Sequence, residues 1–177
     1  MSSIRTATKL DRDKIREVHL HAFSEDEAQV VATLASNLLS DETSPETFAL
    51  VAEIDGTVVG HIAFSPVTFD TSQKLKGYIL APLAVTPNYQ KRRIGAQLIQ
   101  IGIEQLSKKG VNVLFVYGDP KYYGKFGFKA ETATHYLPPY ELQYPFGWLA
   151  IVMNEAGAAE QPLKVSCVAS LSDPELW

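Results

Sequence analysis

Hydrophobic residues recur along this chain with two different spacings. Apolar residues three to four positions apart form one face of a helix, whereas short runs rich in β-branched and aromatic residues form strands. Helical spacing is found from Ile15 to Phe23, from Val31 to Leu38 and, most regularly, over 95–109. Strand-like runs are found at 4–8, 48–54, 57–64, 78–85, 111–116, 148–153 and 165–169. Because short strands alternate with helices, the pattern predicts an α/β fold.

Polar residues before the first two helical segments predict how those helices begin. Asp11 is expected to cap the first helix, with Leu10 packing onto Ile15 as a hydrophobic staple. Ser24 and Glu27 have the spacing of a capping box, so the second helix should start there. Two helices are therefore expected between the first strand and the second.

The strand-like runs carry turn and breaker signals. Asp55-Gly56 lies between the runs 48–54 and 57–64 and predicts a tight antiparallel hairpin. Pro82 interrupts the run 78–85, and because proline has no N–H to donate, we expect a bulge or a sheet edge there.

The next three segments predict a crossover. A strand, the helix 95–109 and a nearly all-apolar strand follow one another, which is the order of a right-handed crossover connection. Gly102 on the inner face of the helix should permit close packing. No repeat or long linker divides the chain. We expect residues 1–154 to form one domain, with 155–177 as a C-terminal extension packed on it.

Composition narrows the class of protein. The 177 residues are 46% hydrophobic, with a formal net charge of −4 and one dense basic run, Lys91-Arg92-Arg93. Nucleic-acid binding needs clustered positive charge, so no nucleic-acid partner is expected. Cys167 is the single cysteine, the N-terminus shows no signal-peptide pattern, and no apolar run approaches the roughly 20 residues that span a bilayer. We therefore expect a cytoplasmic protein without a membrane partner.

The basic run lies where a predicted strand passes through a turn into a helix. The segment reads Leu83-Ala84-Val85-Thr86-Pro87-Asn88-Tyr89-Gln90-Lys91-Arg92-Arg93-Ile94-Gly95-Ala96. Backbone amides at a helix start are unpaired and carry the positive end of the helix dipole, so they suit a phosphate or pyrophosphate. On spacing alone, a solvated basic turn is an equally good interpretation.

Other catalytic patterns find no support. His19, His21, His61 and His135 do not have the spacing of a metal site, and no metal is implied. Ser65 lacks the flanking glycines of a hydrolase nucleophile. A nucleotide-binding α/β protein is disfavoured because neither G-x-G-x-x-G nor a Walker A sequence is present.

Two segments resemble motifs of the GNAT acetyltransferases. The turn resembles their coenzyme A motif, Gln/Arg-x-x-Gly-x-Gly/Ala, at Gln90, Gly95 and Ala96, whereas Arg93 stands where the family usually has glycine. Downstream, Tyr122-Tyr123-Gly124-Lys125-Phe126-Gly127-Phe128 resembles the family's Tyr-x-x-x-Gly-Phe segment. Gly118-Asp119-Pro120 before it is especially similar to the YhbS-like branch. The order of elements from Ile4 to Met153 resembles the family pattern as well.

The resemblance implies a fold and an activity. The fold would be a mixed, mainly antiparallel sheet of about seven strands with helices on both faces. The activity would be transfer of acetyl from acetyl-CoA to an amine, on a small molecule or a peptide, by direct attack through a tetrahedral intermediate. Residues implied for acetyl-CoA binding are Leu83, Ala84, Val85, Gln90, Lys91, Arg92, Arg93, Ile94, Gly95, Ala96 and Tyr123. The Leu83 amide would polarise the thioester carbonyl, and Tyr123 would protonate the departing thiolate.

Several alternatives stay open. The base that deprotonates the acceptor is not identified: Asp119 suits a turn better than this role, and Glu141 and His135 are no better supported. The aromatic and proline-rich stretch 135–147 would either line the acceptor pocket or cover the end of the sheet. A coenzyme A-binding regulatory module without transfer activity is the alternative function. The oligomeric state is open, a homodimer included.

Overall fold

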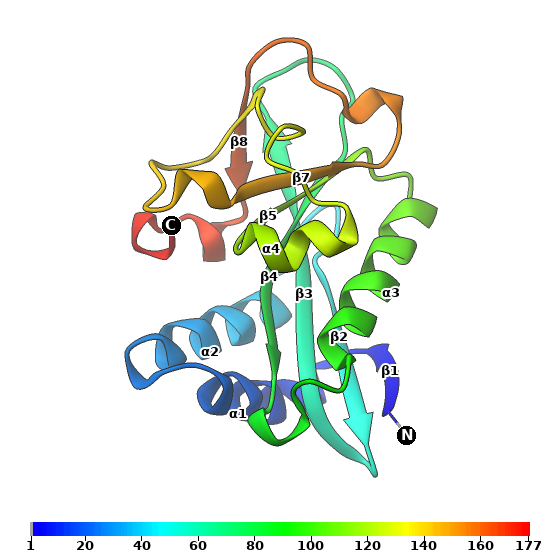
Figure 1. Ribbon diagram of the computed structural model, residues 1–177, viewed down its shortest axis with the longest axis vertical. Coiled ribbons are helices and arrows are strands. Elements are labelled where there is room, and N and C mark those ends of the chain that lie inside the picture. Colours follow the sequence, from blue (N-terminus) through cyan, green and yellow to red (C-terminus); the bar gives the residue numbers. More distant parts are fainter. Residues whose placement is uncertain (1) are drawn as a thin grey trace. The chain divides into compact units, whose positions relative to one another are not determined.

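The computed structural model describes residues 2–177. These residues form two compact units, each made of two stretches of chain. Among the described residues, the first unit comprises 2–64 and Ala81–Ile103, and the second comprises Ser65–Leu80 and Glu104–Trp177. The chain passes between units inside regular elements, namely strands β3 (Thr57–Phe69) and β4 (Gly77–Val85) and helix α3 (Ile94–Lys108), which are labelled in Figure 1.

The sheet of the first unit begins with an antiparallel meander. Strand β1 (Ser2–Thr6) pairs with β2 (Phe48–Ile54), and β2 pairs with β3 from Phe48↔Phe64 to Ile54↔Thr57. Asp55 and Gly56 connect β2 to β3 with φ of 52° and 77°, the positive values that a two-residue hairpin turn requires. The predicted hairpin is confirmed.

A bulge in β3 decides which residues face which helices. Pairing shifts between Ala52↔Gly60 and Glu53↔Val58, which leaves Val59 as an extra residue. Beyond the bulge, Gly60 and Phe64 contact α3, because a Cβ added at Gly60 would meet Ile94 and Leu98 of that helix. A Cβ added at Gly102 of α3 would collide with the Phe64 ring, so the expected close packing at this glycine is confirmed. His61 lies on the opposite face, where it contacts His19.

Helices α1 (Arg12–Ala22) and α2 (Glu25–Ser40) lie side by side in the first unit (Figure 1). Their inner faces bury apolar residues against the strands, in one cluster with Ile15, Val18, Ala35, Val51, Val58 and Ala84. At about 25 cal/mol per Å² of apolar surface removed from water, such a cluster supplies the main driving force for docking the two helices. Helices therefore cover both faces of the first unit's strands.

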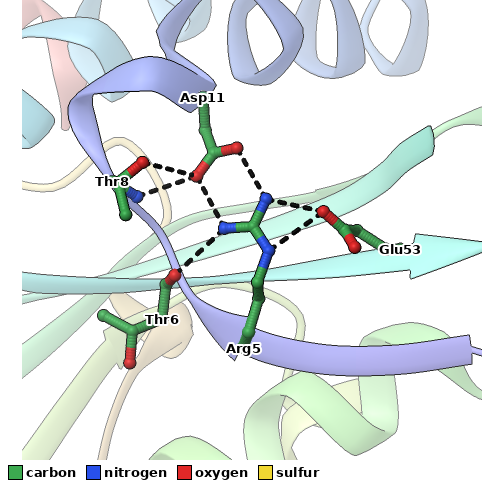
Figure 2. A network of polar contacts seen from close by, with 5 residues as sticks. All are labelled: Arg5, Thr6, Thr8, Asp11 and Glu53. Carbon is green, nitrogen blue, oxygen red and sulfur yellow. Dashed lines mark hydrogen bonds and ion pairs between the residues drawn. The ribbon is translucent and has the colours of Figure 1, made fainter. Parts of the chain in front are cut away.

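The predicted capping of α1 is wrong. Leu10 is 95% exposed because a 3-10 turn, Lys9–Asp11, precedes the helix and turns this side chain into solvent. The Asp11 carboxylate makes no cap bond to α1; it accepts from the backbone N–H of Thr8 at 2.8 Å and from two Arg5 nitrogens at 2.7 and 2.8 Å, as Figure 2 shows. Arg5 also donates to Glu53 on β2.

The first turn of α2 differs from its prediction in the same way. The helix begins after Ser24, as expected, but the Ser24 side chain makes no cap hydrogen bond. Instead the Ser24 carbonyl accepts from the backbone N–H groups of Glu27 and Ala28. The position of the helix start is confirmed, and the predicted capping box is wrong.

The second unit pairs strands from distant parts of the chain. Strand β4 pairs in parallel with β5 (Val113–Tyr117) from Gly77↔Val113 to Leu80↔Val116, and β5 pairs antiparallel with β7 (Trp148–Val152). Pro82 lies beyond the end of the β4–β5 pairing, where its missing N–H costs no bond of that ladder. The parallel pairing agrees with the predicted strand, helix and strand connection.

The last strand ties residues 155–177 into this second unit. Strand β8 (Leu163–Cys167) pairs with Val67–Phe69 of β3 and with β6 (Tyr136–Leu137). Over residues 2–177 the strands number eight and are mostly antiparallel, so the predicted mixed α/β sheet is confirmed. The strand that sequence reasoning did not predict is β6, which is two residues long.

Candidate functional site

The turn before α3 has an unusual backbone. A 3-10 turn, Pro87–Tyr89, is followed by extended backbone at Gln90. Lys91 and Arg93 then adopt positive φ of 64° and 66°, and α3 begins at Ile94. A residue with a Cβ in this left-handed region costs about 1 to 2 kcal/mol, and such strain persists where the surroundings enforce it, often at ligand sites. Alternation of left-handed and other residues turns successive N–H groups toward one point.

The start of α3 presents unpaired donors at the same turn. The amide of Gln97 donates to Arg93 O at 3.0 Å, which makes Arg93 the first acceptor of the helix. The N–H groups of Ile94, Gly95 and Ala96 precede this bond and have no carbonyl four residues earlier within the helix. They also lie at the positive end of the helix dipole. This arrangement fits a phosphate or pyrophosphate.

Contacts within the first unit hold the turn in place. Gln90 Nε2 donates to Val85 O at 2.9 Å, and the backbone N–H of Thr86 donates to Val59 O at 2.8 Å. The Arg92 guanidinium lies over the Tyr89 ring, 5.1 Å from its centroid. The side chains of all three basic residues are exposed. The matching glutamine of the motif therefore acts here by fastening the turn to the end of β4.

The end of β4 alternates between buried and half-buried residues. Ala84 is buried in the cluster with α1 and α2, whereas Leu83 and Val85 are half-buried. The structure thus places Leu83, Ala84, Val85 and the residues from Gln90 to Ala96 together in the first unit.

Tyr123 belongs to the second unit, at the end of the short helix α4 (Pro120–Tyr123). Its ring packs edge-on against Tyr122 and Phe128, with centroids 5.1 and 5.7 Å away. Gly118 makes room for it, because a Cβ at Gly118 would lie 2.5 Å from the ring. Burial, with smaller effects of Tyr122 and Asp119, raises the pKa of the Tyr123 phenol well above its usual range. The hydroxyl therefore stays protonated at neutral pH and can donate.

Tyr122 is a packing residue in this turn. It is half-buried, its ring lies edge-on to Phe126, and the Lys125 ammonium lies 5.9 Å from its centroid. Asp119 caps α4, since its carboxylate accepts from the backbone N–H of Lys121 at 2.9 Å. The turn-forming interpretation of Asp119 is thus supported. Glu141 and His135, the other residues considered as base, are exposed.

The aromatic stretch 135–147 divides into a buried part and an exposed part. Tyr136 is buried, packs on Phe115 and donates to Gly157 O. Trp148 stacks on Phe115 with a centroid separation of 5.0 Å. Tyr144 and Phe146 are 52% and 65% exposed. The first part covers strand β5, whereas the second presents aromatic surface to solvent.

Sequence reasoning missed a pair of buried histidines. His19 on α1 and His61 on β3 are both fully buried, and His19 Nε2 lies 2.8 Å from His61 Nδ1. Helical periodicity gives a signal for the burial of His19, but no sequence pattern signals its partner. Among residues 2–177, no group of three or more His, Cys, Asp or Glu side chains is arranged to hold a metal ion. No helix in this described range is long and apolar enough to cross a membrane.

The comparisons with known sequences agree with one another. A model of the acetyltransferase (GNAT) family matches residues 12–128. YjhQ of Escherichia coli K12, described as an uncharacterized N-acetyltransferase, is 41% identical over 170 residues, covering 94% of this chain and 90% of YjhQ. YhbS of the same organism, described in the same words, is 34% identical over 135 residues, covering 75% of each chain.

Solved structures show the same fold. YhbS from Escherichia coli in complex with CoA has a TM-score of 0.83 and 24% identity, covering 97% of this chain and 92% of YhbS. A GNAT family acetyltransferase from Brucella melitensis in complex with acetyl-CoA has a TM-score of 0.70 and 30% identity. The match covers 96% of this chain and 97% of the Brucella chain. With the family model, the curated relatives and the geometry of the turn in agreement, this chain belongs to the GNAT family of acetyltransferases.

Proposed function

We propose that this protein is an N-acetyltransferase that moves the acetyl group of acetyl-CoA to an amine. The observation that carries the proposal is the turn from Gln90 to Ala96, where left-handed residues and unpaired amides converge at the start of α3. Family membership supplies the reaction class, and the related structures from Escherichia coli and Brucella melitensis were obtained with CoA and acetyl-CoA.

The turn would bind the pyrophosphate of acetyl-CoA. Backbone N–H groups of residues 91–96 would donate to its oxygens, and the side chains of Lys91 and Arg93 are exposed beside them. An arginine at position 93 offers an additional charged donor where the family usually has glycine. The pantetheine arm would pair with the backbone of Leu83, Ala84 and Val85.

The reaction would proceed by direct attack. The amine nitrogen forms a bond to the thioester carbon, and the carbonyl electron pair moves to oxygen, where the Leu83 amide would stabilise the oxyanion. The C–S bond then breaks and the sulfur leaves with its electron pair. Tyr123 would give this thiolate its proton, a role supported by its place in the segment that resembles the family's Tyr-x-x-x-Gly-Phe motif and by a phenol that is protonated at neutral pH. No residue is assigned as the base that takes the proton from the acceptor ammonium.

A coenzyme A-binding module without transfer activity is the competing function. Such a module would share the turn with the enzyme but would have no need of a phenol that donates a proton. Tyr123 therefore discriminates between the two functions, and its presence in the segment that resembles the family's tyrosine motif favours the enzyme. Burial raises the pKa of the Cys167 thiol to about 12, so this side chain is protonated and weakly nucleophilic at neutral pH.

The deciding experiment is a screen for CoA release. The full chain is incubated with acetyl-CoA and a panel of small amines and peptides, and free thiol is measured with and without each acceptor. We expect acceptor-dependent release that Tyr123→Phe reduces and Tyr122→Phe largely retains. Binding of acetyl-CoA without release for any acceptor would favour the regulatory module. A cytoplasmic location and the absence of a nucleic-acid partner remain predictions from composition and charge.

A further inference from the structure

The charges around the start of α3 are opposite to those that stabilise a helix. Acidic side chains are favourable in the first turn of a helix, because the positive end of the helix dipole lies there. Helix α1 has Asp13 in its first turn, and α2 has three acidic residues. Helix α3 has none, and it begins directly after the basic run Lys91–Arg93. This arrangement is unfavourable for the ligand-free chain.

The sequence around this turn supplies no carboxylate to offset the cations. The chain has 20 Asp and Glu residues and a net charge of −4, yet no acidic residue lies between Asp70 and Glu104. The exposed positions of α3 before Glu104 are Gln97 and Gln100, which are neutral. Of the ion pairs formed among residues 2–177, none includes a member of the basic run Lys91–Arg93. The positive charge of the run is therefore left for an anion from outside the chain.

The backbone and the side chains of this turn offer two different kinds of donor. The N–H groups of residues 94–96 precede the first hydrogen bond of α3 and suit the pyrophosphate, as proposed above. The Arg92 guanidinium lies over the Tyr89 ring. Lys91 and Arg93 flank it at positive φ, and their side chains are exposed. Two cationic side chains thus remain once the backbone has bound a pyrophosphate.

Coenzyme A carries a third phosphate besides its pyrophosphate. This group is a phosphomonoester on the ribose 3′ oxygen, and a phosphomonoester carries nearly two negative charges at neutral pH. Arginine binds such a group with two parallel N–H donors, and lysine binds it as a point charge. Lys91 and Arg93 together therefore match the 3′-phosphate in charge.

We propose that the side chains of Lys91 and Arg93 bind the 3′-phosphate of coenzyme A, so that the protein discriminates coenzyme A and its thioesters from their 3′-dephospho forms. The inference rests on the proposed function, because it requires that the coenzyme binds at this turn. It assigns the two side chains a role in specificity, separate from the binding of the pyrophosphate by backbone N–H groups.

Calorimetry of the full chain with CoA and with 3′-dephospho-CoA tests this directly. Wild-type protein should bind CoA about 10-fold or more tightly than 3′-dephospho-CoA, the effect expected of charged hydrogen bonds. The double variant Lys91→Gln/Arg93→Gln should lose most of this difference. Its affinity for CoA should fall about 10-fold, whereas its affinity for 3′-dephospho-CoA should change less than about 3-fold, because solvent screens exposed charges from more distant groups. Lys108→Gln/Lys109→Gln removes two positive charges at the far end of α3 and should keep the wild-type difference.

The stability of the ligand-free chain gives a second measurement with an opposite sign. Lys91→Gln/Arg93→Gln removes two cations from the positive end of the helix dipole, so its Tm without ligand should rise by about 1 to 3 °C. A merely structural role of these side chains would lower Tm instead.

Three results would overturn the inference. They are equal wild-type affinities for CoA and 3′-dephospho-CoA, equal losses of both affinities in the double variant, and a lower Tm of that variant without ligand. The first result is read in the wild-type chain, so it holds even where the variant fails to fold. Each of the three leaves coenzyme binding at the turn intact, whereas failure of both ligands to bind would contradict the proposed function and this inference with it.

Discussion

At the scale of single residues, the hydroxyl of Tyr123 is the group whose removal is most informative. Tyr123→Phe keeps the ring that packs on Phe128 and removes only the proton donor. An interaction made mainly in the transition state lowers kcat and kcat/KM together. We expect a loss of about 10²- to 10⁴-fold in both, or roughly 3 to 5 kcal/mol, with the Kd for acetyl-CoA nearly unchanged.

The neighbouring tyrosine is the matched control for this measurement. Tyr122→Phe removes a hydroxyl from the same turn and should lower kcat much less. Equal losses in the two variants would show that the hydroxyls act through packing. An unchanged kcat in Tyr123→Phe would assign the proton to water or to another donor.

Arg93 offers a second test, because its backbone adopts a strained positive φ whereas its side chain is a candidate phosphate ligand. Arg93→Gly relieves a positive φ of 66° but gives the unfolded chain more freedom, so we expect a change in unfolding free energy within about 1 kcal/mol. If the guanidinium contacts a phosphate, the same variant should weaken acetyl-CoA binding several-fold in calorimetry. Arg92→Gly, at the arginine that lies over Tyr89, is the comparison. Unchanged affinity in Arg93→Gly would limit position 93 to a backbone role.

At the scale of elements, the packing of α3 on β3 depends on one missing methyl group. Gly102→Ala gains helix propensity of about 1 kcal/mol, but the new Cβ would collide with the Phe64 ring. We expect the collision to dominate, with a net destabilisation of about 1 to 3 kcal/mol in urea unfolding. Adding Phe64→Leu should recover part of this loss. A more stable Gly102→Ala variant would show that the ring moves aside freely.

The contact between His19 of α1 and His61 of β3 leads us to predict that the free energy of unfolding depends on pH. The pKa of His19 is lowered to about 4 and that of His61 lies well below 6.5, so the unfolded chain binds more protons as the pH falls below 6.5. Stability should therefore fall from pH 6.5 toward pH 4, by up to about 1.4 kcal/mol per pH unit for each histidine. His19→Phe should flatten this slope in urea unfolding. His21→Phe, on the exposed side of the same helix, should leave it as it is.

Elements with a strong local pattern could be predicted from the sequence. The strand Phe48–Ile54 was predicted with its observed bounds because apolar and β-branched residues end there at a hairpin signal. Leu10 was predicted wrongly because the 3-10 turn that exposes it carries no distinctive pattern. Strand β6 was missed because two residues are too few to show a period.

The candidate site could be predicted only in part, for a related reason. Gln90, Gly95 and Ala96 mark the turn by residue type, so its position in the sequence was predictable. The left-handed backbone at Lys91 and Arg93 was not, because residues with a Cβ seldom adopt it. The partner of His19 lies 42 residues away and faces it through the register of β3 beyond the bulge at Val59. Such contacts depend on tertiary structure, which local sequence patterns do not predict.

At the scale of the whole molecule, ligand binding should be measurable as an increase in thermal stability. If acetyl-CoA binds the native chain through the turn from Gln90 to Ala96, as proposed, it binds a structure that the unfolded chain lacks and should raise Tm with concentration. At 100 times Kd the added stability would be about 2.7 kcal/mol. Differential scanning calorimetry with acetyl-CoA, and with adenosine as a control lacking the pyrophosphate, measures this. A Tm unmoved by saturating acetyl-CoA would contradict the proposed binding site.

The interleaving of the two units in the chain has a consequence for synthesis. Because Ser65–Leu80 precedes Ala81–Ile103, the ribosome releases a stretch of the second unit before the first unit has all its residues. The first unit is complete only when Ile103 has emerged, and the second waits for Trp177. A nascent chain that stalls shortly before residue 103 therefore leaves Val67–Phe69 and Gly77–Leu80 without their partner strands β8 and β5, and such unpaired edges are prone to aggregate. Slow translation of this segment should make the protein depend on chaperones.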